Sequence, residues 1–319
     1  MTFTQSLRPV VLTRQLLSIT LHPDMSPKSA SKSEQDGALV RFWGVRGSIP
    51  VPGPQTVRYG GNTSCVEVRA DGQLIILDAG SGLRPLGISL SEEFRGQPLD
   101  LTILVTHTHW DHIQGFPFFS PAYEIQNRIC VHGFTDVRRG LSDTFAGQME
   151  ASYFPVSLSQ MPGSIGFEEL SGDAFQVGSI RVSACRTNHP GMCYGYRLDT
   201  SAGSICYIPD HEIATPEPGA EAEGIANLIR GADVVIFDAQ YTADEYRKHT
   251  GWGHSSMEDA VRCARDMQVK QLQLFHHDPS HDDAFLDEML ADARCIAAGS
   301  AMRIESAREG IQLTLKASD

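Results

Sequence analysis

The sequence predicts an α/β fold in which two stacked mixed sheets carry helices on their outer faces. Short runs rich in β-branched and aromatic residues recur along the chain, bounded by Gly, Pro, Asp and Ser, as is typical of strands. Runs with the apolar period of a helix are found in the second half only. The early strands follow one another closely, and the later ones alternate with helices. That order suits two layers of sheet with helices outside.

The first 37 residues are predicted to form a poorly ordered extension, 1–37, ahead of one domain, 38–319. Residues 26–37, SPKSASKSEQDG, are polar and low in aromatic residues, so they offer little apolar surface for a core. Residues 1–25 lack the apolar core and the small-residue cleavage site of a secretory signal. No linker interrupts the rest of the chain.

The domain is expected to contain a series of short strands and three helices. The strands are predicted over 38–44, 64–70, 73–79, 101–107, 128–133, 179–185, 193–198, 204–210, 233–239, 271–276 and 311–317. The helices are predicted over 222–232, 256–267 and 283–299. The second helix begins at SSMED, where a serine can cap the helix and acidic residues suit its first turn.

Composition narrows the class of protein. A formal net charge of -13 counts against a general nucleic-acid binder, although a bound metal could still attract a small anionic substrate. The seven cysteines are odd in number and include no Cys-x-x-Cys pair, which favours free thiols in a reducing compartment. No apolar run approaches the ~20 residues that span a bilayer. We therefore expect a cytoplasmic enzyme without a membrane partner.

The strongest chemical signal is THTHWDH, residues 106–112, which follows the apolar run LTILV. His107 and His109 are alternate residues, so an extended strand end would aim them the same way. Asp111 and His112 follow across a turn and can face back toward the same point. Imidazole and carboxylate ligands this close together suit zinc or a similar transition metal. The alternative, a solvated loop, fits a lone histidine better than this cluster.

Further ligand candidates lie where other predicted strands end. His189 follows SIRVSACRTN, Asp210 ends SICYIPD, and His276 follows QLQLF. Each residue alone would be read as a surface or capping residue. Their shared position at strand ends instead suggests that several strands deliver ligands to one rim of a sheet.

These motifs resemble the metallo-β-lactamase fold superfamily of metallohydrolases, and the resemblance covers residues 38–317. It implies a four-layered αβ/βα sandwich with two divalent metal ions at one edge, zinc first, with manganese or iron as alternatives. It also implies a supporting aspartate, Asp78 in LDAGSG. The implied ligands are His107, His109 and His189 for one ion, Asp111, His112 and His276 for the other, and Asp210 as the bridge.

One ligand assignment has two readings, because LFHHDP contains adjacent histidines. Aligned on the preceding strand, it resembles the LTHFSP ending of the phosphodiesterase branch, which favours His276 over His277. His132, His211 in DHE, His249 and His281 are interpreted as surface or supporting residues.

Two segments indicate the branch of the superfamily. VVIFDAQY resembles the HEATY-type segment of the ribonuclease Z branch, with Asp238 in place of Glu, and GWGHSS resembles its GHST segment, which brings His254. A carboxylate that orients a histidine makes a sensible general-acid pair. The alternative readings are a strand-end cap for Asp238 and a helix-cap neighbour for His254.

The predicted function is a metal-dependent phosphodiesterase acting on a small phosphodiester, with a cyclic nucleotide preferred. In this hypothesis a metal-bridged hydroxide attacks phosphorus, Asp111 helps to orient it, and His254, oriented by Asp238, protonates the departing alkoxide. A long nucleic acid is not expected, since residues 134–188 contain no lysine and so no lysine-rich arm like that of ribonuclease Z. A homodimer is compatible with the sequence.

Three alternatives stay open: a β-lactam or lactone hydrolase on the same metals, a tRNA 3′-processing-like endonuclease, and a binding protein that has kept the fold without activity. The segment 42–65 is too rich in Gly and Pro to be a strand throughout, so it is predicted as a loop over the rim of the site. In it, Arg46 or Arg58 could pair with a phosphate oxygen or make no such contact.

Overall fold

The computed structural model describes residues 37–134, 139–213 and 219–317. Residues 1–36 of the predicted extension therefore lie outside the described residues. All seven cysteines lie within the described residues, and each is a free thiol, as expected from the sequence. None of the described helices combines the length and the apolar character that a membrane span requires.

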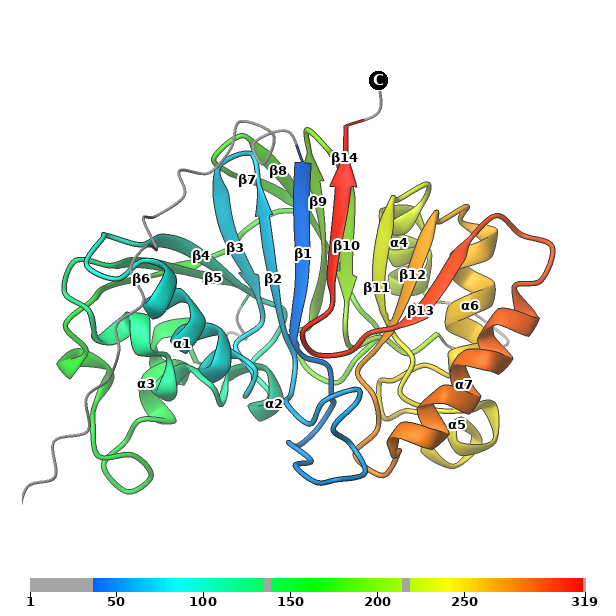
Figure 1. Ribbon diagram of the computed structural model, residues 1–319, viewed down its shortest axis with the longest axis horizontal. Coiled ribbons are helices and arrows are strands. Elements are labelled where there is room, and N and C mark those ends of the chain that lie inside the picture. The colour runs from blue at the N-terminus through cyan, green and yellow to red at the C-terminus, as the bar shows by residue number, and fades with distance from the viewer. Residues whose placement is uncertain (1–36, 135–138, 214–218, 318–319) are drawn as a thin grey trace, which may run out of the picture. The chain divides into compact units, whose positions relative to one another are not determined.

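The described chain forms two seven-stranded sheets that face each other (Figure 1). The first has the order β14-β1-β2-β3-β4-β5-β6, and the second β13-β12-β11-β10-β9-β8-β7. The strands of the first sheet are β1 Gly37–Gly44, β2 Cys65–Ala70, β3 Gln73–Leu77, β4 Asp100–Val105, β5 Arg128–Gly133, β6 Ser164–Glu169 and β14 Gln312–Lys316. Those of the second are β7 Ala174–Val177, β8 Ile180–Arg186, β9 Tyr194–Thr200, β10 Gly203–Ile208, β11 Val234–Asp238, β12 Gln271–Phe275 and β13 Arg303–Ser306.

Both sheets are mixed, as predicted. In the first sheet β14, β1, β2 and β3 are antiparallel neighbours, and β3 to β6 run parallel. In the second sheet β7 to β10 are antiparallel, and β10 to β13 run parallel. Because β10, β11 and β12 are parallel, their carboxyl ends lie at the same edge of the sheet.

Helices cover the outer face of each sheet and complete the predicted four-layered sandwich (Figure 1). On the first sheet these are α1 Leu83–Glu93 and α3 Leu141–Gly147, and on the second α4 Ala220–Ile229, α6 Met257–Asp266 and α7 Asp283–Ile296. Shorter elements are α2 Trp110–Ile113, α5 Ala243–His249, η2 Phe116–Phe118, η3 Ser120–Tyr123 and η4 Leu158–Gln160. The predicted serine cap is confirmed, since the side chain of Ser256 accepts the backbone N–H of Asp259.

Apolar patterning explains the layers. In β1, Ala38, Val40 and Phe42 alternate with half-buried neighbours and enter the core between the sheets. In β4, Leu101, Ile103 and Val105 pack on the side of the helices, and Leu104 enters the core between the sheets from the other face. Each of the strands and helices predicted from the sequence is present within a few residues of its predicted ends.

Candidate metal centre

The predicted ligands meet at one end of the sandwich, where strands of both sheets end. They leave the ends of strands or the first turn of α2: His107 and His109 follow β4, Asp111 and His112 lie in α2, His189 follows β8, Asp210 follows β10, and His276 follows β12. All are buried except His109, which is exposed. Ligands from segments far apart in the sequence are thus held by the ends of rigid elements.

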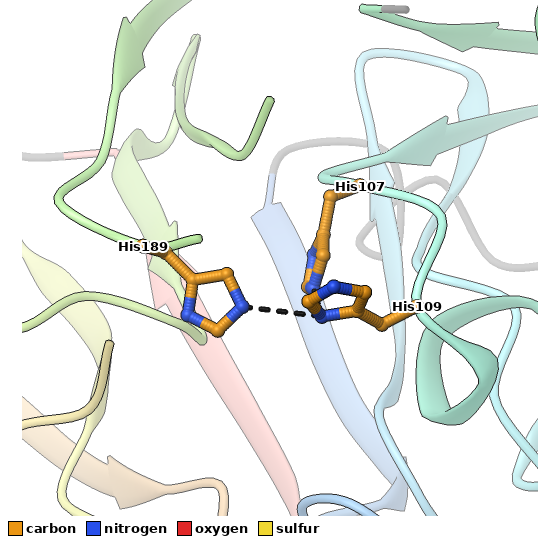
Figure 2. Close-up of side chains that lie close together, drawn as sticks. All are labelled: His107, His109 and His189. Carbon is orange, nitrogen blue, oxygen red and sulfur yellow. Dashed lines mark hydrogen bonds between the residues drawn. The ribbon is translucent and has the colours of Figure 1, made fainter. Parts of the chain in front are cut away.

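Three histidines form the first cluster, and their rings converge in Figure 2. Nδ1 of His109 lies 2.8 Å from Nε2 of His107 and 3.2 Å from Nε2 of His189. Oδ2 of Asp210 completes the set at 3.8 Å from His107 and 3.7 Å from His189. In a tetrahedral zinc site with bonds of about 2.0–2.1 Å, ligand atoms lie about 3.3 Å apart, so this spacing suits one ion.

The second cluster lies on the other side of Asp210. Oδ2 of Asp111 is 3.2 Å from Nε2 of His112 and 3.2 Å from Nε2 of His276. Oδ1 of Asp210 is 3.1 Å from His112 and 3.4 Å from His276. Asp210 therefore presents one carboxylate oxygen to each cluster, which is the arrangement that a bridging ligand needs.

Two buried atoms test whether these residues fit a metal. Nε2 of His112 and Oδ1 of Asp210 are buried and 3.1 Å apart, but they do not meet the geometry of a hydrogen bond with each other or with any other described residue. Buried polar atoms are normally paired, so such a gap between a nitrogen lone pair and a carboxylate calls for a cation. The donor set fits the metal that the sequence implies.

Hydrogen bonds on the far side of the rings orient three of the histidines. Nδ1 of His112 lies 2.7 Å from Oδ2 of Asp78. Nδ1 of His189 lies 2.9 Å from the carbonyl oxygen of Gly253, and Nδ1 of His276 lies 2.9 Å from Oε1 of Gln240. In each case Nδ1–H is the donor, which leaves a lone pair on Nε2 directed at the clusters.

The charges of the clusters also suit metal ligands. Burial lowers the pKa of His107 and of His189, so both rings favour the neutral form that binds metals. Burial opposes the charge of Asp210, but His112 and His276 hold the pKa of that carboxyl well below its usual range. Burial likewise opposes protonation of His112, but Asp210 and Asp111 raise its pKa well above the usual value, so binding of a cation would displace a proton from this ring.

Asp78 supports the centre from beneath, as the resemblance implies. It is fully buried in a left-handed conformation with φ of 59°, directly after β3. Besides the His112 ring, its carboxylate accepts the backbone N–H of Thr106 at 2.8 Å and the Tyr207 hydroxyl at 2.9 Å. Left-handed backbone is unusual outside glycine and concentrates at functional sites.

The loop between β1 and β2 reaches the second cluster through Gly47 and Ser48. The backbone N–H of Ser48 donates to Oδ2 of Asp111 at 2.8 Å. A Cβ on Gly47 would lie 2.4 Å from Nδ1 of His276, so the ring can occupy its place only beside a glycine. The prediction of a loop at the rim is correct in place, but the roles of these two residues were not foreseen.

The loop arginines serve the fold. Arg46 is fully buried and donates to the carbonyl oxygens of Gly60 at 2.8 Å and His281 at 2.6 Å, which supports the reading in which it makes no phosphate contact. Arg58 forms an ion pair with Asp287 at 2.6 Å.

The remaining predicted pair is His254 and Asp238. Nδ1 of His254 lies 2.8 Å from Oδ2 of Asp238, the last residue of β11. The His254 ring stacks on His276 with centroids 4.9 Å apart, and its Nδ1 is 4.0 Å from Oδ2 of Asp210. The pair therefore borders both clusters.

The Asp238 carboxylate is itself fixed by the backbone, since it accepts the N–H of His211 at 3.0 Å and of Gln240 at 3.1 Å. Burial opposes protonation of His254, but Asp238 and then Asp210 raise its pKa to about 9. Bound cations would lower that pKa again, because like charges repel.

The other histidines lie outside the clusters. His277 turns away, with Nε2 2.8 Å from the carbonyl oxygen of Ala307, and burial lowers its pKa to about 3. His211 is buried behind the site, where its Nδ1 accepts the backbone N–H of Asn188 at 3.1 Å. The structure thus brings His276, and not His277, to the ligand set. The rest contact other groups: His132 lies beside Glu168, His249 against Trp252, and His281 beside Glu245.

Sequence reasoning missed several supporting residues. Gln240 stands two residues after Asp238 in FDAQY, and Glu212 stands two residues after Asp210 in DHE. Their positions beside predicted site residues are the signal that could have identified them. The Glu212 carboxylate accepts the backbone N–H of Gly251 at 2.8 Å and of Gly253 at 2.9 Å, which fixes the loop that carries His254. No local pattern marks Tyr207, because it reaches the centre from another strand.

Comparison with known proteins agrees with this geometry. A family model described as a beta-lactamase superfamily domain matches residues 74–277, more than half of the chain. A ribonuclease Z of Bradyrhizobium sp. (strain ORS 278) is 24% identical over 296 residues, covering 80% of this chain and 93% of that protein.

Among solved structures, the metallo-beta-lactamase fold protein YhfI of Bacillus subtilis has a TM-score of 0.65 at 18% identity, covering 88% of this chain and 99% of that one. The short form of human tRNase Z has a TM-score of 0.59 at 20% identity, covering 86% and 98%. The chain therefore belongs to the beta-lactamase superfamily, and it is a metallohydrolase with the metallo-β-lactamase fold.

Proposed function

We propose that the protein is a dinuclear metal-dependent phosphodiesterase that hydrolyses a small phosphodiester, with nucleotides, including cyclic ones, as the preferred class. His107, His109 and His189 hold one ion in this proposal, Asp111, His112 and His276 the other, and Asp210 bridges them. Two divalent cations there, zinc first and manganese or iron as alternatives, would supply positive charge for a phosphate and would activate water.

The observation that carries the proposal is the hydrogen bond between His254 and Asp238 beside the two clusters. Since Nδ1–H of His254 donates to Asp238, Nε2 is the nitrogen that takes up and releases the proton. A departing alkoxide is a strong base, and a positioned imidazolium can protonate it as the bond to phosphorus breaks. Opening of a lactam expels nitrogen and not an alkoxide, so the pair favours a phosphodiester over a β-lactam.

Asp111 has a second role in the proposal. Its Oδ2 faces His112 and His276 and also accepts the Ser48 N–H. The carboxylate is therefore held in one orientation, in which it could also accept a hydrogen bond from the attacking water.

A second candidate is an endonuclease that acts on RNA. It is favoured by the similarity to proteins named ribonuclease Z and tRNase Z. Against it stand the formal net charge of -13 and the composition of residues 134–188, which contain four arginines but no lysine and so no lysine-rich arm for gripping a long polyanion.

The test is a comparison of four substrates with protein purified without chelator: cyclic AMP, bis(p-nitrophenyl) phosphate, a precursor tRNA transcript and a chromogenic cephalosporin. We expect hydrolysis of the first two. Turnover of the cephalosporin alone would overturn the phosphodiesterase, and site-specific cleavage of the transcript with inactivity on cyclic AMP would select the endonuclease.

A further inference from the structure

A pocket is lined by residues of α2, η2 and α3 and of the segments beside them. Its volume is about 430 Å³, and its lining includes Thr108, Trp110, Phe118 and Tyr153. Thr108 and Trp110 alternate along the chain with the candidate ligands of THTHWDH, so one wall of the pocket and the metal centre are parts of the same short segment. Neighbouring Cα atoms are ~3.8 Å apart, so the backbone of this wall stands directly beside the backbone of His107, His109 and Asp111.

The pocket gathers aromatic rings that the fold leaves exposed. The exposed fraction is 73% for Trp110, 55% for Phe118 and 74% for Tyr153. Large apolar side chains grouped at a concave surface mark ligand sites more often than chance exposure does. Exposed aromatic faces are the surfaces on which nucleobases stack.

Polar groups in the same pocket could read a planar ring. The side-chain nitrogen of Gln148 is buried and has no hydrogen-bond partner among the described residues, and Gln148 lines the pocket. A side-chain amide offers a donor and an acceptor side by side, as the edge of a base does.

Arg139 adds a cation to this wall. A Cβ on Gly147 would lie 2.2 Å from Nη2 of Arg139, so the glycine leaves the space that the guanidinium occupies. A guanidinium at this place can stack on a ring or contact a phosphate oxygen.

We propose that this pocket binds the base of a nucleotide substrate, with Trp110, Phe118 and Tyr153 as stacking surfaces and Gln148 bonded to the edge of the base. The inference rests on the proposed function, because it assumes that the phosphodiester of the same molecule lies on the metal centre. It adds to that proposal the place where the base of the nucleotide binds.

The experiment compares two diesters with one leaving group: the p-nitrophenyl esters of thymidine or adenosine 5′-phosphate, and methyl p-nitrophenyl phosphate, which has no base. The ratio of their kcat/KM values is measured for the wild type, Tyr153→Ala and Gln148→Leu. The control is Ile125→Ala, whose side chain is 80% exposed and outside the pocket.

We expect the wild type to prefer the nucleoside ester, and Tyr153→Ala to reduce that preference by about 5- to 100-fold, as loss of a stacking ring does. Gln148→Leu should change the preference between thymidine and adenosine, and Ile125→Ala should change neither ratio. An unchanged ratio in both pocket variants, or an equal fall on both esters, would overturn the base site.

Calorimetric titration with thymidine and adenosine 5′-monophosphate separates this inference from the proposed function. Weaker binding to Tyr153→Ala than to the wild type supports the pocket even if neither diester is hydrolysed, a result that would remove the phosphodiesterase alone. Hydrolysis of the methyl ester together with equal affinities of both proteins for the monophosphates would remove the pocket alone.

Discussion

Gly47 lies so close to His276 that a single added methyl group would meet the imidazole ring at 2.4 Å. Real Cβ atoms do not approach a ring so closely, so either the ring or the loop would have to move. The glycine that makes this contact precedes Ser48, whose N–H donates to Asp111. The loop between β1 and β2 therefore controls two ligands of the second cluster at once.

Gly47→Ala should weaken metal binding at the second cluster, because His276 is displaced while the first cluster is untouched. We expect affinity for one of the two ions to fall about 10- to 100-fold, the range seen when groups around the ligands are changed. Titration of the metal-free protein with zinc measures it. The control is Gly53→Ala in the same loop, where an added Cβ meets nothing within 4 Å. If Gly47→Ala binds both ions with unchanged affinity, the loop moves away without displacing His276, and the prediction is wrong.

Metal analysis should find close to two transition-metal ions per chain. Removal of the ions with a chelator should lower the melting temperature, since Nε2 of His112 and Oδ1 of Asp210 are then buried without a partner. Two equivalents of zinc should restore the melting temperature and the activity together. Protein that is purified without chelator and holds no metal would contradict the dinuclear centre.

Asp210→Ala should remove most of the bound metal and all activity, because one oxygen of this carboxylate faces each cluster. Metal content and turnover are measured on the same sample, and circular dichroism checks that the sandwich is intact. Asp292→Ala, which removes an exposed carboxylate from α7, should change neither quantity. Full metal content in Asp210→Ala would mean that another residue bridges the ions.

The fold could be predicted because strand and helix patterns are local. The elements that escaped prediction lack such patterns. β6, β7 and β13 are partly exposed edge strands, and α3 and α5 are helices of only seven residues. α1 contains Pro85 and Gly87, which are typical of helix ends. Pro85 is tolerated because it lies in the first turn, where its missing N–H costs no hydrogen bond. Gly87 is there for packing, since a Cβ would lie 2.8 Å from Phe119.

The candidate ligands could be proposed from the sequence because strand ends deliver them, and the structure brings all of them together. The supporting contacts could not, because they join residues that are distant in the chain. Tyr207 reaches Asp78 across the core between the sheets, over a separation of 129 residues. Only the three-dimensional arrangement shows such a pair.

Asp78 and Tyr207 give a graded test of this support. Asp78→Ala removes the acceptor for His112 and leaves the Tyr207 hydroxyl buried without its partner, so both metal affinity and the free energy of unfolding should fall. Tyr207→Phe removes one donor and keeps the ring, so we expect it to cost about 0.5–1.5 kcal/mol of stability while both ions are retained. Denaturant unfolding and metal analysis measure the two effects. Loss of metal in Tyr207→Phe would show that the hydroxyl, and not only the carboxylate, orients the ligand.

The most discriminating variant is His254→Ala. If His254 is a general acid, this variant should keep both ions and lose about 10²–10⁴-fold in turnover of thymidylyl-thymidine, whose leaving group is an alkoxide. It should lose much less against the p-nitrophenyl ester of thymidine 5′-phosphate, because p-nitrophenolate departs with little help from a proton. Asp238→Asn should show the same dependence on leaving group in weaker form, since the hydrogen bond at 2.8 Å loses its charge. His276→Ala should instead lose metal and activity toward both diesters. If His254→Ala loses turnover equally on the two diesters, His254 positions the substrate. If the variant loses metal, His254 is a ligand. Unchanged turnover of both diesters would remove the observation on which the phosphodiesterase rests.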